Sequence, residues 1–254
     1  PMPQPSVVMP DAMPQAVPET VPEDQVKNLF NVETTFDITQ RWDNLRWNIS
    51  APGSANILSE LTWKDVAIIE LEDRGQLTLD NKFILFDWRG GIGWVHHGKN
   101  QDSDYLGDAR TLEFSRSDNS AKQGHVIDLS GGGGYRLDLT PILTKTQKDS
   151  LNIMKLYVDA LGGYAYNETQ YFMTNGNQTV SAFGFGAPLG PFDGLKSNYQ
   201  AQWKGPWIGG AIKGEIERWH GMLRWEYHWL DYYGKANWNL RSDFMHPKSY
   251  EHIA

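Results

Sequence analysis

Apolar and polar residues alternate along two long, neighbouring segments of the chain. Between 57 and 72 the odd positions are mostly apolar and the even positions mostly polar, with Leu61, Trp63, Ala67, Ile69 and Leu71 against Glu60, Lys64, Glu70 and Glu72. Between 84 and 94 the parity is reversed, with Ile84, Phe86, Trp88, Ile92 and Trp94 against Asp87 and Arg89. A period of two predicts β-strands. Both runs hold their phase for roughly a dozen residues, about twice the length of an ordinary strand, as a tilted membrane-spanning strand does.

The same alternation predicts five further strands, at about 29–49, 127–139, 154–160, 208–217 and 223–229. In the first strand the phase slips, and a bulge near Arg41–Asn44 would let Leu45, Trp47 and Ile49 continue the apolar face. The fourth strand is interrupted by four glycines, 131–134, which indicates a bend or a close backbone contact.

The connections between these strands alternate in length. Those near 80, 145 and 220 are short, whereas 98–122, 167–197 and the polar stretch beyond 232 are predicted to be long loops. Tryptophans lie near strand ends, as in interfacial girdles: Trp42, Trp47, Trp63, Trp94, Trp203, Trp207 and Trp229. We therefore predict an all-β, antiparallel up-and-down transmembrane β-barrel with charges lining the lumen and apolar residues facing lipid. A soluble lipocalin-like barrel is the less favoured alternative.

Composition narrows the possible classes. The 254 residues carry a net charge of −8, which argues against a nucleic-acid partner, and they include no cysteine for a disulfide or thiolate site. No run of 18 apolar residues is present, which excludes a helical membrane protein. The histidines are scattered and form no ligand cluster, so neither a metal site nor a cofactor is predicted.

Residues 1–25 differ from the rest of the chain. They hold seven of the 13 prolines, and Pro10, Pro14, Pro18 and Pro22 recur every four residues. This composition favours an extended, polyproline-like tail outside a barrel domain at 26–254. The tail is expected in the periplasm, either disordered or ordered on a protein partner. Because the chain begins at Pro1 without a starting Met, we expect an exported protein whose signal peptide has been removed.

Three segments resemble the omptin family of outer-membrane proteases. SELTWKDVAIIELEDRGQL at 59–77 is similar to that family's second strand, with its S-x-L-x-W start. NQDSDYLGD at 100–108 resembles the loop that holds a catalytic Asp-x-Asp. YQAQWKGPWIGGAIKGEIERWHGMLRWEYHW at 199–229 resembles the sixth and seventh strands. The resemblance implies a barrel in the outer membrane of a Gram-negative bacterium, with outer-membrane lipid and lipopolysaccharide as partners.

The resemblance also implies a catalytic site. Asp102 and Asp104 would form one acidic pair, facing an aspartate–histidine pair across a bound water. The second pair is Asp243 and His246, where the family has Asp-x-His and this chain has one extra residue. Residues i and i+3 of a strand do not share a face, so the spacing departs from the family pattern. Polar external loops are also rich in aspartate for reasons unrelated to catalysis.

Two functions follow from these observations. The first is a non-catalytic outer-membrane barrel with an omptin-like scaffold and a structural or partner-binding role, favoured by the Asp-x-x-His spacing and the proline tail. The alternative is an omptin-type endopeptidase that hydrolyses peptides with an activated water. Seven strands are visible where the family has ten, and strands in lipid cannot leave an open edge. We therefore expect that the C-terminal strands of the barrel are missing from this sequence; the alternative is that another chain completes the barrel.

Overall fold

The computed structural model describes residues 30–50, 53–79, 84–142, 154–184, 187–216, 218–241 and 250–253. The predicted proline-rich tail at 1–25, the turn at Asp80–Asn81 and most of the turn at Pro141–Ser150 lie outside these residues.

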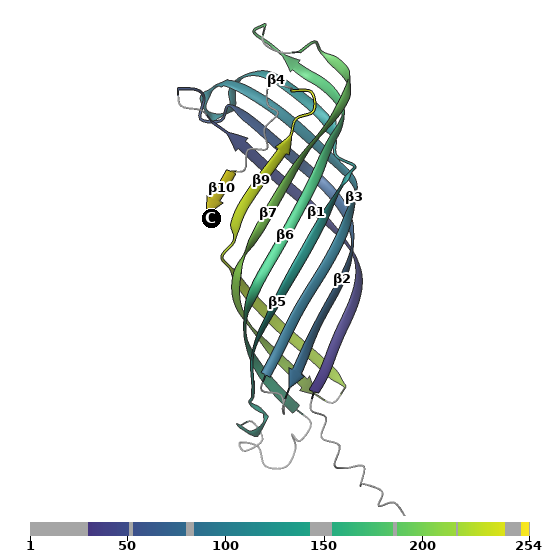
Figure 1. Ribbon diagram of the computed structural model, residues 1–254, viewed down its shortest axis with the longest axis vertical. Coiled ribbons are helices and arrows are strands. Elements are labelled where there is room, and N and C mark those ends of the chain that lie inside the picture. The colour runs from purple at the N-terminus through teal and green to yellow at the C-terminus, as the bar shows by residue number, and fades with distance from the viewer. Residues whose placement is uncertain are drawn as a thin grey trace, which may run out of the picture.

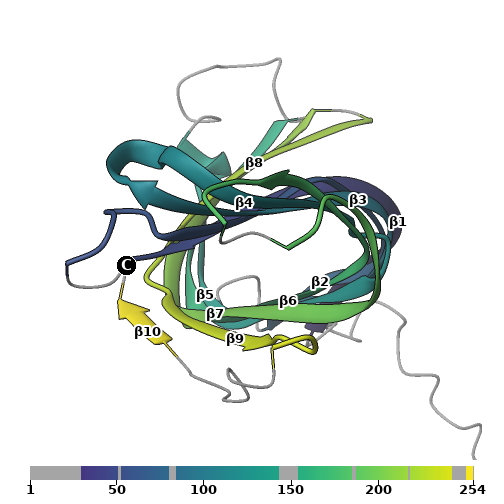
Figure 2. The ribbon, with the colours of Figure 1, turned by 90° about the horizontal axis from the view of Figure 1, so that it is seen from above.

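The described chain is an antiparallel β-barrel, with a short 3-10 turn between β3 and β4 (Figure 1). The elements are β1 (Phe30–Ile49), β2 (Ser59–Leu79), β3 (Ile84–Gly107), η3 (Asp108–Arg110), β4 (Thr111–Ser120), β5 (Gly124–Asp138), β6 (Met154–Ser181), β7 (Gly190–Ile216), β8 (Trp219–His228), β9 (Asp231–Asn237) and β10 (Tyr250–Ile253). Viewed from above, the strands curve around a common axis (Figure 2). The prediction of an all-β antiparallel barrel is confirmed.

Successive strands pair in the order of the chain. At two places in the sheet, two shorter strands lie end to end where one long strand would otherwise run. The first half of β3 pairs with β5, and its second half pairs with β4. The opposite edges of β4 and β5 both pair with β6. Likewise β7 pairs with β8 near its end and with β9 nearer its start. β4–β5 and β8–β9 thus behave as two long strands, each interrupted once.

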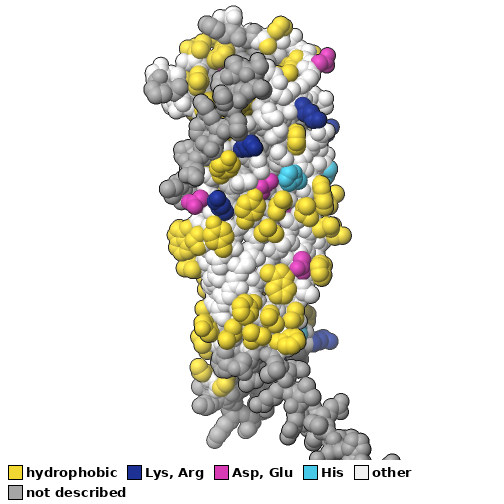
Figure 3. All heavy atoms as spheres, viewed as in Figure 1, with side chains coloured by type: hydrophobic (Ala, Val, Ile, Leu, Met, Phe, Trp, Pro, Cys, Tyr) yellow, Lys and Arg dark blue, Asp and Glu magenta, His cyan; other side chains and the backbone are white. Residues whose placement is uncertain are grey.

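An apolar belt surrounds one half of the barrel. On β3 four outward apolar side chains, Ile84, Phe86, Ile92 and Trp94, are 41–49% exposed. The belt continues on other strands with Leu129, Tyr135, Ile208 and Ile212. Figure 3 shows hydrophobic side chains gathered over the middle and lower parts of the face in view. The segment from Ile84 to Trp94 matches the 9–11 residues that a tilted strand needs to cross a bilayer. The prediction that this strand carries its apolar residues on the outer face is confirmed.

The barrel continues well above this belt. The sequence predicted a long loop at 98–122, and this is wrong. These residues form the end of β3, a tight turn and β4. Most of 167–197 is strand as well, and β9 begins within a stretch that was expected to be loop-like. Above the belt the outer face meets water, so polar residues occupy both faces and the period of two disappears from the sequence.

The apolar residues of β2 do not share one face. Leu61 and Trp63 point into the barrel and are 2% and 0% exposed, whereas Ile69 and Leu71 point outward. The change occurs at Lys64 and Asp65, where β2 carries one residue more than β1, and Asp65 has a positive φ of 54°. The side-chain oxygen of Asn44 accepts a hydrogen bond from the Asp65 backbone N–H at 3.1 Å. This bulge reverses which parity faces inward.

A register shift was predicted near Arg41–Asn44, and one occurs between Asp43 and Leu45. The extra residue lies on β2, however, and β1 keeps its alternation throughout. Leu45 and Trp47 therefore point into the barrel, and the prediction that they continue the lipid-facing side is wrong.

Ion pairs fill the lumen at the height of the belt. Arg41 of β1 reaches Asp128 of β5 at 2.6 Å and Glu70 of β2 at 3.2 Å. Arg224 of β8 holds Asp87 of β3 through two hydrogen bonds of 2.8 Å. Buried charges need such partners, because an unpaired charge in a low-dielectric interior is costly. The predicted charged lumen is confirmed, and the pairs join walls that are distant along the sheet.

An apolar layer closes over these charges just above the belt. It is built by Leu61, Trp63, Val66, Ile68, Val95, Ala121, Val126, Tyr171, Met173, Tyr199 and Ala201, with Trp47, Trp203 and Trp238 packed against it. The rings of Trp63 and Tyr199 stack at 5.5 Å. The predicted girdle is thus partly wrong. Trp42, Trp94 and Trp229 are exposed, but Trp63 and Trp207 are buried and belong to the interior.

The four-glycine run lies within β5 and brings backbones close together. A β-carbon on Gly132 would lie 2.5 Å from the Gly162 carbonyl oxygen and 2.7 Å from the ring of buried Trp207. One on Gly134 would lie 1.9 Å from the Ala160 carbonyl oxygen. The predicted close backbone contact is confirmed.

Two edges of the sheet have no strand partner among the described residues. One is β1, which pairs only with β2 there, and the other is formed by β8 and β10, which pair only with β7 and β9. Both carry outward apolar side chains, such as Phe36 and Trp225. The sequence predicted seven strands, and this count is wrong, because the described residues form ten. The expectation that something further completes the barrel stays a prediction.

Candidate functional site

Asp102 and Asp104 lie on β3, beyond the upper rim of the apolar belt at Trp94. Their register partners on β2 are Leu61 and Ser59, and on β4 they are Ser117 and Ser115. The two aspartates therefore belong to a regular part of the sheet and not to a loop, as the sequence suggested. Being two residues apart on a strand, they share one face.

The face they share is the interior one. Leu61, directly opposite Asp102, is 2% exposed and belongs to the apolar layer. Asn100, on the same side of β3, is 2% exposed and lies opposite Trp63. Both carboxylates consequently project into the upper, membrane-distal half of the barrel. We call the space they face the cup, defined by Ser59, Leu61, Asp102 and Asp104.

This environment perturbs both acids. Burial, reinforced by the neighbouring Asp104 carboxylate, raises the pKa of Asp102 to about 7, and the positive charge of Arg241 opposes the rise. Burial also raises the pKa of Asp104, against the hydroxyls of Ser59 and Ser115 and the charge of Arg241. Two nearby carboxylates, one half protonated near neutral pH, form a pair that can both accept and donate a proton.

Arg241 follows β9 and is placed by the apolar layer. Its backbone N–H donates to the carbonyl of Trp238 at 3.1 Å, and the ring of Trp238 lies 6.5 Å from that of Trp47. Arg241 thus brings positive charge to the aspartate pair. The other two predicted site residues, Asp243 and His246, lie outside the described residues, so their position relative to the pair stays a prediction.

Three contributors to this environment were not singled out from the sequence: Ser59, Ser115 and Arg241. A signal for Ser59 was present, because it begins the S-x-L-x-W motif, whose Ser59, Leu61 and Trp63 share one parity and one interior face. For Ser115 and Arg241 there was no local signal. Their relevance comes from strand register and from the return of β9 toward the cup.

The outer side of the cup is stabilised separately. Arg110, at the tip of the β3–β4 hairpin, donates to both carboxylate oxygens of Glu60 at 2.7 and 2.8 Å. The side chains of Asn56 and Asp108 each accept a hydrogen bond from the other loop's backbone, both at 2.8 Å. These contacts tie the β1–β2 loop to the hairpin that carries the aspartate pair.

Histidine does not assemble a metal site in the part of the chain that the structure describes. His125 contacts Glu168 at 3.3 Å and His228 contacts Glu226 at 2.8 Å, each as a single pair. No group of three potential ligands occurs among the described residues.

The fold and its apolar belt define an outer-membrane β-barrel protein. None of the described residues forms a helix long and apolar enough to cross a membrane. The sequence model of the Protochlamydia outer membrane protein family, Pom, matches residues 35–254, and the chain belongs to that family. No curated protein matches the chain. The family supports an outer-membrane location, whereas the omptin resemblance of the individual motifs stays a prediction.

Proposed function

We propose that this outer-membrane barrel is a surface endopeptidase of the omptin type, with Asp102 and Asp104 as one half of its catalytic site. The observation that carries the proposal is the placement of both carboxylates on one interior face above the belt, with the pKa of Asp102 raised to about 7. Polar loop aspartates without a catalytic role would be solvated and would have no reason to share a buried face.

The chemistry needs a water that is deprotonated as it attacks. The pair, with one proton between its two carboxylates, would orient that water toward the carbonyl carbon of the scissile peptide bond. The proton taken from water would pass to His246, paired with Asp243, and then to the leaving amine as the carbon–nitrogen bond breaks. The extra residue in Asp-x-x-His requires these two side chains to converge from a segment that is not a regular strand.

A non-catalytic scaffold is the second candidate. It is favoured by the interior of the barrel, where ion pairs such as Arg41–Asp128 and the stacked Trp63 and Tyr199 brace walls from both ends of the sheet. Such a rigid barrel could present the cup, or the proline-rich tail, to a partner without hydrolysing anything.

Peptide hydrolysis by the purified, lipid-reconstituted barrel separates the two candidates. A fluorogenic peptide library is offered with and without lipopolysaccharide, which the omptin resemblance implies as a partner. We expect cleavage by the wild type and a loss of at least a hundredfold in Asp102→Asn, because one acid–base group typically contributes 10²–10⁴. Asp118→Asn is the matched control, since Asp118 is exposed on the same hairpin and pairs with Gln101 on the outer face.

Cleavage that is equal in wild type and Asp102→Asn would remove the peptidase assignment. Absence of cleavage by a correctly folded wild type would leave the scaffold role. A pH profile adds an independent check, because Asp104→Asn removes a like charge and should lower the apparent pKa of the remaining acid.

We further propose that the barrel sits in the outer membrane of a Gram-negative bacterium after signal-peptide removal, with residues 1–25 reaching a periplasmic partner. The start of β1, the end of β2 and the start of β3 are level in the sheet register, at the end of the barrel opposite the cup (Figure 1). A protease added to intact cells should therefore cut the cup loops and spare an epitope tag in 1–25. Cutting of the tag in intact cells would show that the barrel has the opposite orientation in the membrane.

A further inference from the structure

Arg241 belongs to the wall of the cup that lies across from the aspartate pair. It follows β9, and in the strand order β1-β2-β3-β4-β6-β7-β9-β10 this strand is four places from β3, which carries Asp102 and Asp104. This path has eight positions, so four places correspond to opposite sides of a ring. Figure 2 shows β9 and β4, the neighbour of β3, on opposite sides of the barrel axis. A peptide in the cup would therefore have the aspartates on one side and Arg241 on the other.

The segment that carries Arg241 is held firmly against β7. Trp238 packs against the apolar layer below the cup. The side chain of Asn239 accepts a hydrogen bond from the Lys196 backbone N–H at 2.7 Å and donates one to the Gly194 carbonyl at 2.6 Å. The Arg241 backbone N–H donates to the Trp238 carbonyl at 3.1 Å and closes a turn. The chain thus gives the Arg241 side chain a defined starting point at the cup.

The charge of Arg241 acts on both aspartates although Arg241 itself is exposed. It opposes the rise that burial causes in the pKa of Asp102 and of Asp104. A third acid, Glu113, adds to the rise in the pKa of Asp104, but it accepts a hydrogen bond from Arg116 at 2.8 Å and so has a counter-charge of its own. Arg241 consequently lies between the buried pair and the open part of the cup, where its charge can also act on a bound molecule.

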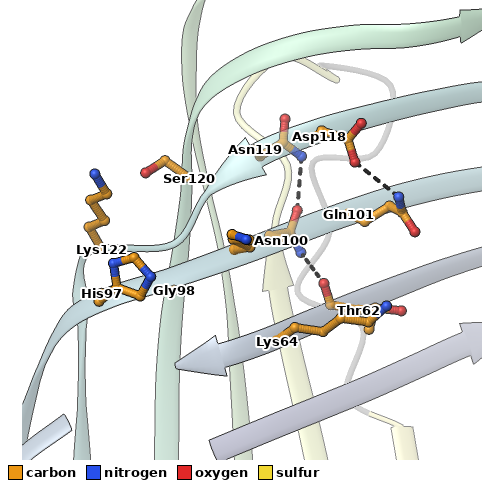
Figure 4. Close-up of a pocket in the computed structure, with 11 residues that line it drawn as sticks. Thr62, Lys64, His97, Gly98, Asn100, Gln101, Asp118, Asn119, Ser120 and Lys122 are labelled. Atoms are coloured by element: carbon orange, nitrogen blue, oxygen red, sulfur yellow. Dashed lines mark hydrogen bonds between the residues drawn. The ribbon is translucent and has the colours of Figure 1, made fainter. Parts of the chain in front are cut away.

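The inner wall beside the aspartates is polar and uncharged. Asn119 of β4 donates a hydrogen bond to Asn100 of β3 at 2.8 Å (Figure 4). The amide of Gln178, on β6, donates to the hydroxyl of Ser115 at 3.0 Å. These groups can bind the backbone of a peptide but cannot select the charge of its side chains. That selection falls to the aspartate pair and to Arg241.

Opposite charges on opposite walls impose a direction on a bound peptide. A carboxylate side chain turned toward β9 meets the guanidinium of Arg241, whereas one turned toward β3 is repelled by the aspartate pair. Guanidinium and carboxylate groups also match in shape, since two parallel N–H···O bonds can form between them. A basic side chain would be drawn to Asp102 and Asp104 instead, where it would compete with the attacking water.

We propose that Arg241 determines specificity, and that the cup accepts peptides with an aspartate or glutamate side chain beside the scissile bond. The inference rests on the proposed function, because it takes the aspartate pair as the place where the peptide bond breaks. The carboxylate at the end of a peptide has the same chemistry. An endopeptidase cuts within a chain, however, so the side-chain carboxylate is the group that we assign to Arg241.

Cleavage of matched peptides by the lipid-reconstituted full chain tests this specificity. The peptides are amidated at the C-terminus, otherwise uncharged, and carry glutamate, glutamine or lysine beside the cleaved bond. We expect kcat/KM to be about fivefold higher for glutamate than for glutamine, the size of one partly screened ion pair, and lowest for lysine. Arg241→Gln should remove the difference between glutamate and glutamine, and Arg241→Lys should keep it. Arg241→Glu should favour the lysine peptide.

The matched control is Lys196→Glu, which reverses a charge on the outer face of the neighbouring strand. Lys196 is exposed and lies between Leu195, which packs on the apolar layer, and buried Ser197. This variant should keep the preference of the wild type. Equal kcat/KM for the three peptides in the wild type would overturn the proposal. So would a uniform loss for all three in Arg241→Gln, or a higher rate for a glutamine peptide with a free C-terminus than for the amidated glutamate peptide.

Binding separates this inference from the peptidase assignment. Fluorescently labelled peptides are titrated onto Asp102→Asn, which should leave them intact, and Kd is measured by anisotropy. We expect the glutamate peptide to bind about fivefold more tightly than the glutamine peptide, and equally in Asp102→Asn/Arg241→Gln. This preference without any cleavage by the wild type would overturn the peptidase assignment and keep the role of Arg241. Equal binding of both peptides to Asp102→Asn would overturn the role of Arg241, whether or not the wild type cleaves.

Discussion

Leu61 and Asp102 face each other across β2 and β3, so that a side chain 2% exposed lies beside a carboxylate. An apolar neighbour cannot solvate the charged form, and the second carboxylate, Asp104, adds repulsion. Burial beside Leu61 and the nearby Asp104 carboxylate together raise the pKa of Asp102 to about 7.

This relationship predicts how stability depends on pH. Because the folded pKa of Asp102 lies above its unfolded value of 3.8, the folded state binds more protons, and stability falls as pH rises from about 4 to about 7. Asp102→Asn does not titrate. We expect it to stabilise the barrel at pH 8 relative to wild type by about 1–2 kcal/mol, after discounting for partial solvent screening.

Urea unfolding in lipid vesicles at pH 5 and pH 8 measures the difference. The advantage of Asp102→Asn should shrink at pH 5, where part of the wild-type Asp102 penalty is relieved by protonation. An equal effect of the substitution at both pH values would show that Asp102 keeps an ordinary pKa.

The glycine run of β5 offers a matched pair of substitutions. Gly132→Ala places a methyl group 2.5 Å from the Gly162 carbonyl oxygen and against Trp207, and should cost about 1–3 kcal/mol in the free energy of unfolding. Gly131→Ala, one residue earlier, has nothing within 4 Å and should change stability by less than about 0.5 kcal/mol. Similar losses for both variants would contradict the close-approach explanation.

The lumen contains an ion pair whose loss should be costly. Arg136 is 6% exposed and donates two hydrogen bonds, of 2.7 and 2.8 Å, to Asp159, which is 1% exposed. Arg136→Met leaves that carboxylate buried without its main partner, and we expect a loss of roughly 3–5 kcal/mol. Lys155→Met breaks the exposed pair with Glu215 and should cost no more than about 1 kcal/mol. Comparable urea midpoints for the two variants would argue that the lumen is hydrated.

The position of the membrane can be tested on the outer wall. Leu129 lies on β5 opposite Gly90, within the apolar belt, and is 49% exposed. Leu129→Arg places a charge toward the bilayer interior and should destabilise the barrel by about 2–4 kcal/mol. Gln101→Arg, on the outer wall above the belt, should have little effect. A harmless Leu129→Arg would mean that this face does not meet lipid.

The sequence predicted the belt correctly because lipid imposes a strict rule on outward residues. Ile84, Phe86 and Trp94 keep one parity, and Asp87 and Arg89 keep the other, as the barrel has them. Within the belt every second residue must be apolar, and the signal is therefore strong.

Above the belt the same rule fails in two ways. Leu61 and Trp63 have the parity of Ile69 and Leu71 but face inward, because the bulge at Asp65 reverses the sides and leaves no trace in the apolar pattern. The segment 98–122 reads as a loop because water contacts its outer face, so that face no longer needs to be apolar. Depth in the membrane, which the sequence does not state, decides which pattern a strand shows.

The sequence predicted that the two aspartates share a face, but it did not predict their surroundings. Two aspartates at i and i+2 share a face on any strand, and Asp102 and Asp104 do so here. Burial beside Leu61 raises the pKa of Asp102, and the charge of Arg241 opposes that rise. Leu61 and Arg241 reach the pair through sheet register and the return of β9, and no local sequence pattern predicts either contact.

The apolar layer has a consequence for the permeability of the cell envelope. Its side chains come from every wall, from Trp47 on β1 to Trp203 on β7 and Trp238 beyond β9. A hydrated ion or sugar entering the cup would have to shed its water to pass between Trp63 and Tyr199, and would then meet the Arg41–Asp128 pair. A bacterium making this protein in large amounts should therefore admit nutrients and antibiotics no faster than before.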